Sequence, residues 1–578
     1  MKFKVFTVFL LVNCLCLLRI CPTQACGYYE TEADYRAMMF RAMLPSMRTM
    51  YPFNYTMSLY EEPLSTDPDE SDRYRNCAEW LAACDPSVTL DDIYQIQYNT
   101  DSRLWLKAFE KNAWKMYFPQ NTFVQFLVKK QNKDLLDYMV FAKKMELTEV
   151  GGGRRFEEWE NSSSYGSASY ETDEEYPKEE TVKPIKAQLL KTAWERLQTA
   201  PIPFLKQRYA FQVCRLRYQV DKVDSEIAGA DVFSRYFGRI QPDNLMSIWA
   251  GLFEAMRISP SETERYRLLV QVFSNSNEKK FRCVQLFEDR FDPDLLTSKE
   301  LSTAIVMLAV RNPGRALDSI QKAYSLDRTN PYIPFLILRE INKLEDWMIT
   351  PLFYGKYAGR DPFECAYRWN KKEEITTDSI DETGLKLQAE NNATDRQYLA
   401  QLKAFLEEIR PKNNDEIRDF YTIALAHLSL LQENAGDARK YLAQVSSGAN
   451  ASIRLQKQLE TIWLAIKTQD VNSQSFQKVF LQNIEDLNRV ATPNYNNKQM
   501  LYTLTLSLAN EYLKAGRRVY GNLLRMKADL FRYAYEEYGW YDLEYRTGDN
   551  YVTLKYFDEN ANLADMDQLI GLLEKQSK

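Results

Sequence analysis

The residue types that could do chemistry are few, and the first is a single histidine. His427 is the only imidazole among the 578 residues. Catalytic triads and multi-histidine metal sites need an imidazole beside a nucleophile or beside further ligands, so neither can exist away from this residue. His427 stands between Ala426 and Leu428 in a helix-like apolar stretch, with no metal-ligand spacing around it. We therefore expect a packed or partly exposed histidine, and the sequence predicts no metal, no cofactor and no imidazole-based catalytic site.

Two cysteines and a glycine run were the next candidates for chemistry. Cys77 and Cys84 are seven residues apart in a stretch that predicts one helix. Two helical turns place such residues on the same face about 10 Å apart, which is too far for a disulfide or for one metal ion. We expect buried thiols here. The glycine run 151–153 precedes two arginines but lacks the Lys-Ser/Thr of a P-loop, so it indicates a flexible linker.

Paired carboxylates are the one enzymatic route that the composition leaves open. Glu536 and Glu537 lie beside Tyr538, Trp540 and Tyr541, and glycosidases built as α/α toroids use two carboxylates with aromatic sugar platforms. Adjacent helical residues point about 100° apart, however, so these two side chains do not converge on one sugar. We expect no enzyme, and a carboxylate-based glycosidase stays the second alternative.

The first residues indicate export. Residues 1–25 contain two lysines, an apolar run of about 14 residues and then small Ala25, which is the order of a signal peptide and too short for a membrane span. Ala25-Cys26 resembles the end of a bacterial lipobox, with Thr23 where leucine is usual. Lipidation of Cys26 is favoured over a simple cut at the same bond. The acyl chain would tether the protein to a membrane, and an outer-membrane lipoprotein is favoured over a free periplasmic form.

The charge and the cysteines of the mature chain argue against a nucleic-acid-binding protein and against a disulfide-stabilised fold. Removal of the three basic residues of the leader changes the formal net charge from −6 to −9. Nothing concentrates positive charge along one face, so nucleic acid is not an expected partner. Six cysteines remain, or five if Cys26 is acylated, at irregular spacing. This is not a disulfide framework.

Apolar residues recur with helical periodicity along most of the chain, and strand alternation is limited to 551–556. Two polar stretches interrupt the pattern: a Gly/Ser/acidic segment at 150–183, expected to be a disordered linker, and an insert at 369–394, expected to be a loop. The sequence therefore predicts an all-α protein with a smaller N-terminal helical region. Its expected parts are the signal peptide 1–25, the helical region 26–149, the linker 150–183, helical repeats 184–368, the insert 369–394 and further repeats with a cap at 395–578.

Three stretches have the pattern of helix hairpins with small residues where the helices cross: 302–330, 425–445 and 502–530. In the last, Ala509 and Tyr512 precede Gly516 at a turn, and Gly521 and Ala528 follow. These spacings resemble the tetratricopeptide repeat, although Arg525 stands where that family has a large apolar residue. The resemblance implies a solenoid of helix pairs with a concave face that binds peptides or proteins. A generic helical bundle or α/α toroid is the other interpretation.

We therefore expect an exported scaffold or adaptor whose partners are other envelope proteins, with specificity set by polar positions on the inner helices. A glycan- or nutrient-binding lipoprotein that works with a transporter is the alternative, although the C-terminal signatures of that family are missing here. Asp378-Ser379-Ile380 matches a short acceptor motif for O-linked glycans. Ser379 is expected to carry any glycan, whereas Ser319 is not, because Ile320 beside it should belong to the core.

Overall fold

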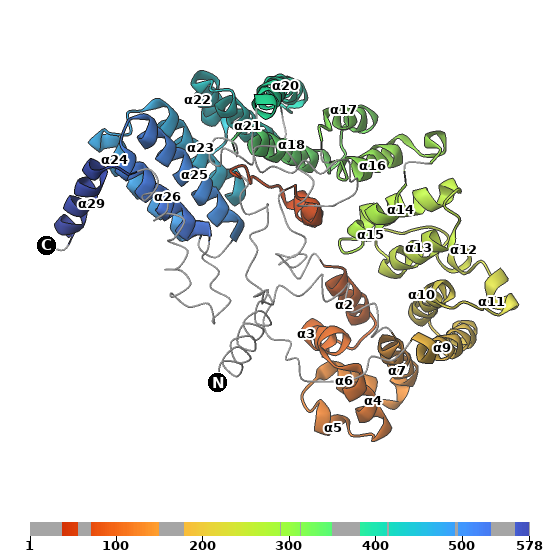
Figure 1. The fold of residues 1–578 in the computed structure, drawn as a ribbon. Coiled ribbons are helices and arrows are strands. Elements are labelled where there is room, and N and C mark those ends of the chain that lie inside the picture. The colour runs from red at the N-terminus through yellow and green to blue at the C-terminus, as the bar shows by residue number, and fades with distance from the viewer. Residues whose placement is uncertain are drawn as a thin grey trace, which may run out of the picture.

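The computed structural model describes residues 37–55, 71–148, 179–288, 291–312, 314–349, 382–412, 415–491, 495–532 and 561–576. Within these ranges every regular element is a helix, and the helices stack into a curved solenoid (Figure 1). The predicted all-α solenoid class is therefore confirmed. The leader, Cys26, Ser379, Glu536, Glu537 and the strand candidate 551–556 lie outside the described residues.

Short helices make up the N-terminal part of the chain. They are η2 (Pro45–Phe53), α2 (Asp72–Ala82), α3 (Leu90–Tyr94), the π-helix η4 (Gln95–Asn99), α4 (Ser102–Glu110), α5 (Trp114–Tyr117), α6 (Thr122–Leu127), η5 (Lys130–Asn132) and α7 (Lys133–Leu147). Polar residues begin several of them, because their side chains accept hydrogen bonds from the otherwise unpaired first amides. Ser71, Thr89, Asp101 and Asn121 cap α2, α3, α4 and α6 in this way.

The body of the molecule follows as longer helices. They are α9 (Glu179–Thr199), α10 (Pro203–Gln219), α11 (Ser225–Gly229), α12 (Val232–Tyr236), α13 (Leu245–Arg257), α14 (Thr263–Asn275), α15 (Lys280–Leu286), η6 (Pro293–Leu295), α16 (Ser298–Ala309), α17 (Leu317–Leu326), α18 (Ile333–Met348), α20 (Glu382–Ile409), α21 (Asp415–Leu431), α22 (Ala435–Gln444), α23 (Ala451–Thr468), α24 (Gln474–Ala491), α25 (Tyr495–Lys514), α26 (Arg518–Arg532) and α29 (Leu563–Gln576). Consecutive helices pack in pairs, and the three predicted hairpins are the pairs α16–α17, α21–α22 and α25–α26.

The pair α25–α26 illustrates the local chemistry of the hairpins. Gly516 ends α25 with a φ of +74°, a left-handed conformation that glycine adopts without strain. Gly521 lies where the two helices approach closely: a Cβ there would be 2.6 Å from Leu513 Cγ and 3.1 Å from the carbonyl oxygen of Ala509. The small residue predicted at this crossing is therefore required by the geometry.

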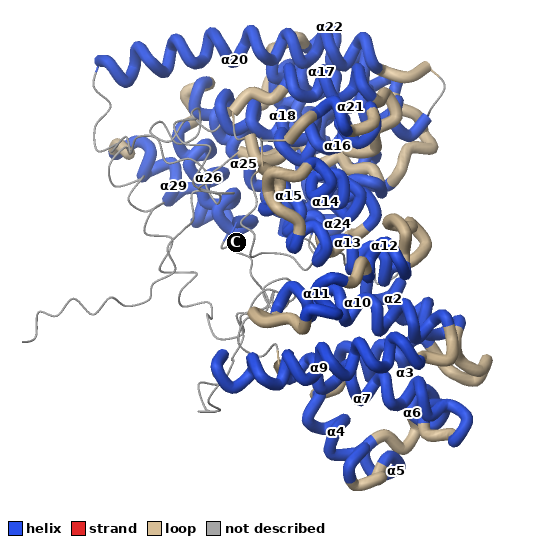
Figure 2. Tube along the Cα trace, turned by 90° about the vertical axis from the view of Figure 1, so that its right-hand side faces the viewer, coloured by secondary structure: helices blue, strands red, loops and turns tan. Residues whose placement is uncertain are grey.

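The stacked helices form an open arc. In Figure 1 the arc runs from α29 and α26 through α21 and α18 to α14 and α10, and the N-terminal helices α4 to α7 close its other end. Figure 2 shows α20 and α22 at one extreme of the molecule and α4 and α5 at the other. The irregular segment with η2 lies inside the arc, on its concave side.

The N-terminal region does not form a unit apart from the body. One continuous cluster of buried apolar side chains extends from Ala37 to Tyr512. Tyr138 of α7 packs against Tyr209 of α10, with ring centroids 5.0 Å apart. The described part of the predicted 26–149 region is helical, and it shares this core with the helical body.

Two predicted boundaries also differ from the structure. Helix α9 begins at Glu179, five residues before the predicted boundary at Pro184, because acidic residues at 179 and 180 favour a helix N-terminus. Helix α20 begins at Glu382, so the second half of the insert 369–394 is helix and not loop. Leucine, lysine, glutamine and alanine there have good helix propensity, and they extend a helix whose later turns are anchored by buried side chains.

Candidate functional site

The concave face is filled by the chain's own N-terminal segment, residues 37–55, which we call the strap. Its first eight residues have no regular secondary structure, yet Met38, Met39, Phe40 and Ala42 are completely buried. Figure 1 shows the strap inside the arc, beside α18 and α23. A segment without helical hydrogen bonds needs other partners for its buried backbone groups.

Side chains of α18 and α25 supply partners for the start of the strap. The amide of Met38 donates to Thr503 Oγ1 at 3.1 Å. The amides of Met39 and Phe40 both donate to Glu345 Oε1, at 2.9 and 2.7 Å. Asn342 Nδ2 donates to the carbonyl oxygen of Phe40 at 2.9 Å. Side chains from two helices that are far apart in sequence thus form hydrogen bonds with the backbone amides and carbonyls of the strap.

Helix α23 continues this pattern over the next residues of the strap. The side-chain amide of Gln456 forms two hydrogen bonds with the strap backbone. Its Nε2 donates to the carbonyl of Met39 at 3.0 Å, and its Oε1 accepts from the amide of Arg41 at 2.7 Å. Ser452 Oγ accepts from the amide of Met43 at 3.0 Å. Polar side chains of the solenoid thereby take the place of the neighbouring strand that an extended peptide would otherwise need.

His427 lies directly beneath this contact. Its Nδ1 is 2.7 Å from Glu460 Oε1 and its Nε2 is 3.1 Å from Glu345 Oε1, and all three side chains are fully buried. The Phe40 ring of the strap packs on the imidazole, with centroids 5.1 Å apart. Burial alone would lower the pKa of His427, but the carboxylates of Glu460 and Glu345 outweigh it and raise the pKa to about 10. The imidazolium therefore bridges two carboxylates near neutral pH.

The sequence correctly predicted a packed histidine but missed both of its partners. Glu345 and Glu460 are 82 and 33 residues away from His427. The available signal was a charged residue inside an apolar helical stripe, because Glu345 follows Leu344 and Glu460 follows Leu459. Such a position predicts a buried charge with a partner, without identifying that partner.

The second half of the strap and helix α2 extend the contact along the concave face. Tyr55 Oη donates to Asp346 Oδ2 at 2.9 Å, and Arg339 donates to the carbonyl of Phe53. In α2, the buried Asp72 accepts from the amide of Asn277 at 3.1 Å.

Arg208 of α10 completes the series of contacts with α2. Its guanidinium donates to Asn76 Oδ1 at 2.8 Å and lies 4.8 Å from the centre of the Trp80 ring. The strap and α2 together therefore connect helices from α10 to α25. The polar positions on the inner helices, which we expected to set partner specificity, bind the chain's own N-terminus along this stretch.

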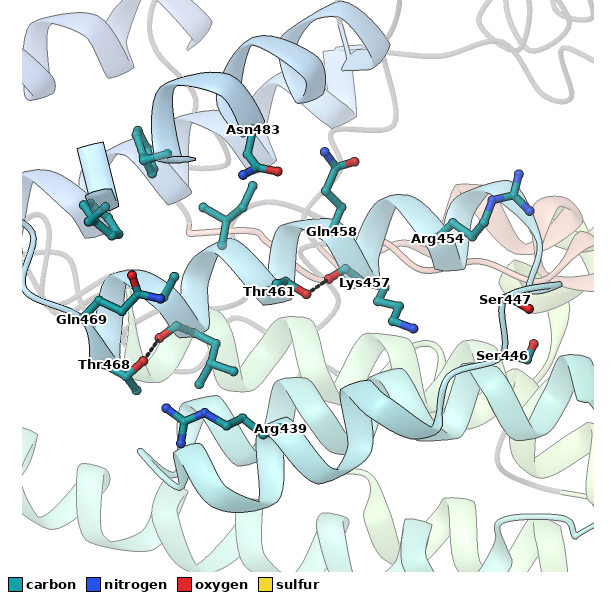
Figure 3. Close-up of a pocket in the computed structure, with 15 residues that line it drawn as sticks. Arg439, Ser446, Ser447, Arg454, Lys457, Gln458, Thr461, Thr468, Gln469 and Asn483 are labelled. Atoms are coloured by element: carbon teal, nitrogen blue, oxygen red, sulfur yellow. Dashed lines mark hydrogen bonds between the residues drawn. The ribbon is translucent and has the colours of Figure 1, made fainter. Parts of the chain in front are cut away.

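A second concavity remains open, on the outside of the arc between α22, α23 and α24 (Figure 3). This cleft has a volume of about 670 Å³. Its apolar side chains are Ile462, Leu464, Ala465, Phe476 and Phe480, and its polar ones are Ser446, Ser447, Gln458, Thr461, Thr468, Gln469 and Asn483. Phe476 and Phe480 stack, with ring centroids 5.7 Å apart.

Three cations and no carboxylate line this cleft: Arg439, Arg454 and Lys457. Lys457 Nζ donates to the carbonyl of Val445 at 3.0 Å, and Arg454 donates to Ala449, so these two also stabilise the C-terminal end of α22. Arg439 is exposed, and the described part of the chain offers it no ion pair or hydrogen bond. The cleft thus presents an unpaired guanidinium beside an apolar floor.

The cysteines have no reactive environment. Cys77, Cys84, Cys214 and Cys283 are free thiols, and burial raises the pKa of each to about 12. Cys77 is buried as expected, whereas Cys84 is half-buried just beyond the end of α2. Among the described residues no three His, Cys, Asp or Glu side chains gather as a metal site would require. No helix within the described ranges has the length and apolar character of a membrane span.

No family model, no curated protein and no solved structure matches the chain. Cys26 and Ser379 lie outside the described residues, while Ile320 is fully buried on α17, as predicted from the sequence.

Proposed function

We propose that the chain is an exported, lipid-anchored helical-repeat protein that acts as a protein-binding scaffold at the outer membrane. The observation that carries the proposal is the cleft between α22, α23 and α24, in which an apolar floor, amide and hydroxyl groups and unpaired positive charge converge. The leader 1–25 and the Ala25-Cys26 site support the envelope location. The tetratricopeptide-like hairpins support a binding role for the solenoid.

The chemistry of the cleft indicates what kind of partner it takes. Gln458 of α23 points into the gap toward α24, where its amide can pair with a peptide backbone (Figure 3). The stacked rings of Phe476 and Phe480 are buried and form the closed apolar base of the cleft, above which one apolar side chain of a partner can sit. Arg439 suits a carboxylate, because a guanidinium donates two parallel hydrogen bonds to it. The preferred partner is therefore an acidic polypeptide segment that carries an aliphatic or aromatic side chain.

Site-specific photo-crosslinking in cells tests this proposal. Thr461 lines the cleft and is exposed, so a benzoylphenylalanine there replaces no core contact. We expect a discrete adduct with an envelope protein, and we expect Arg439→Glu to reduce the yield at least tenfold by repelling an acidic segment. Lys440→Glu is the matched control, since Lys440 is the next residue of α22, is also exposed and does not line the cleft. Equal adduct yields in both variants would contradict the proposal.

A second candidate function, glycan binding, is favoured by an open pocket of about 740 Å³ around the π-helix η4. Gln95, Asn99, Gln120 and Tyr117 line it together with two aspartates, and it has no basic residue. Amides, carboxylates and aromatic rings are the groups that contact sugar hydroxyls and ring faces. Titration calorimetry with maltohexaose and cellohexaose tests this candidate. Binding that Tyr117→Ala abolishes supports it, and no heat from either sugar counts against it.

A further inference from the structure

We infer that the concave face is a peptide-binding groove and that the strap is a separable ligand, which the same segment of a second copy of this chain can replace. The contacts are those of a ligand in a site. Backbone amides and carbonyls at residues 38–43 are paired with side chains of α18, α23 and α25 across sequence separations of more than 300 residues.

The helices that form the walls of the groove contact one another directly as well as through the strap. Helix α18 packs on α21, α21 packs on α23, and α23 packs on α25. The Glu345–His427–Glu460 cluster also joins three of these helices directly, because each of its members comes from a different one. The strap therefore enters a site whose shape is set by helices that already contact one another.

The groove recognises both the backbone and the side chain at one position of the strap. Glu345 Oε1 accepts hydrogen bonds from the amides of Met39 and Phe40, so one carboxylate of the His427 cluster binds the strap backbone directly. Phe40 fits between the imidazole of His427 and the ring of Phe420, whose centroids are 5.1 and 6.1 Å from its own. A segment that lacks either the amide hydrogen or the aromatic ring at position 40 loses the central contacts.

Exchange between copies would replace the strap by an identical segment. The strap ends at Tyr55 and the next described residue is Ser71. Exchange of an identical segment between two copies replaces every contact by an equivalent one, so it has little cost in free energy beyond the association itself. The occupant that this geometry selects is the strap of a second copy, since both its backbone register and its phenylalanine already match the groove.

Peptide incorporation into the full mature chain tests the inference. A protease site is inserted within 56–70, the chain is cut, and a fluorescent peptide of residues 37–55 is added under native conditions. We expect the cut chain to keep its helical circular dichroism signal and to take up the labelled peptide with saturable, concentration-dependent binding. A peptide with an N-methyl group on the Phe40 amide and one with Phe40→Ala should each bind at least tenfold more weakly.

The controls make each result decisive. A chain cut within 151–178 keeps its strap covalently attached to α2, so it should take up at least tenfold less labelled peptide. Uptake by the 56–70 cut chain that is lost with the N-methyl peptide supports the inference. Loss of the helical signal on cutting, or a native signal without uptake, overturns it, because the strap would then be an inseparable part of the core. The cleft on the outer face is not involved, so the proposed scaffold function stands or fails independently.

Discussion

His427 shows what a single residue contributes when its surroundings are charged. Its imidazolium lies between Glu345 and Glu460 in the core, and the strap closes the cluster from above through the amides of Met39 and Phe40. Removing one member of a buried charged group leaves the others uncompensated, at a cost of about 3–5 kcal/mol. The histidine is therefore a structural link between three helices and the strap.

This cluster predicts a pH-dependent stability. The pKa of His427 is raised to about 10 in the folded state, above its ordinary value of 6.5. Its stabilising contribution is therefore complete below pH 6.5 and is lost as the pH rises through 10. We expect His427→Gln to reduce the free energy of unfolding by about 3–5 kcal/mol at pH 6 and by much less at pH 10.5.

The measurement is urea denaturation of both proteins at each pH. Burial lowers the pKa of Lys280 and Lys343 to about 8, so these lysines make stability rise with pH between about 8 and 10.5. They are present in both proteins, and their effect cancels in the difference. A difference that stays constant from pH 6 to 10.5 would show that His427 does not carry the positive charge.

Cys26 is the second residue with a specific expected effect. If it carries the acyl anchor, Cys26→Ala should move the protein from membranes to the soluble fraction, because the variant cannot receive the acyl chains. Fractionation followed by immunoblotting measures this. Mass spectrometry of an unmodified amino-terminal cysteine in the wild type would contradict lipidation and leave the cleavage site unaffected.

At the scale of elements, the helix hairpins were predictable and their limits were not. Apolar periodicity located α16, α21 and α25, and Gly516 and Gly521 located a turn and a crossing. The first turns of α9 and α20 were predicted as linker and loop because these segments contain few apolar residues. A helix that is anchored by buried residues further along can extend through polar residues with good propensity.

The crossing at Gly521 gives a prediction for the hairpin α25–α26. Gly521→Leu should lower the free energy of unfolding by about 3 kcal/mol or more by overpacking. Gly521→Ala also places a Cβ only 3.1 Å from the backbone oxygen of Ala509. It should therefore also destabilise, by about 1 kcal/mol.

Gly436→Ala in α22 is the matched control. There the nearest atom to a new Cβ is Asn434 Oδ1 at 3.5 Å, an ordinary contact. Thermal denaturation should show this variant to be as stable as the wild type or slightly more stable, because alanine has the better helix propensity. If Gly521→Ala melts at the same temperature as Gly436→Ala, the close approach of α25 and α26 is not needed for stability.

For the whole molecule, the strap was beyond prediction from a single sequence. Its contacts join residues up to 465 positions apart, and no local pattern encodes a pairing at that distance. The methionines at 39, 43, 47 and 50 have the spacing of a helix face, yet residues 37–44 have no regular secondary structure, so the local pattern indicates the wrong conformation. The sequence signal for a bound segment on the inner face was limited to charged residues within the apolar stripes of α18 and α23.

The shared core predicts how the molecule responds to proteolysis. A simple linker between two separate domains would, once cut within 151–178, release a helical fragment that begins near Pro184. Because α7 packs on α9 and α10, and α2 packs on α13, we expect the two pieces to stay associated. A nicked sample should show two bands under denaturing conditions and elute at the unchanged volume in native size exclusion. Separation into two particles would show that the interface is weaker than its burial implies.

The strap is synthesised before most of the helices that bind it. Synthesis proceeds from the N-terminus at about 5–20 residues per second, so Thr503 emerges roughly 25–90 seconds after Met38, which precedes it by 465 residues. During that delay the methionine-rich segment has no groove to enter and exposes its apolar side chains. We therefore expect a newly made chain to be prone to aggregation through this segment until α25 is available to bind it.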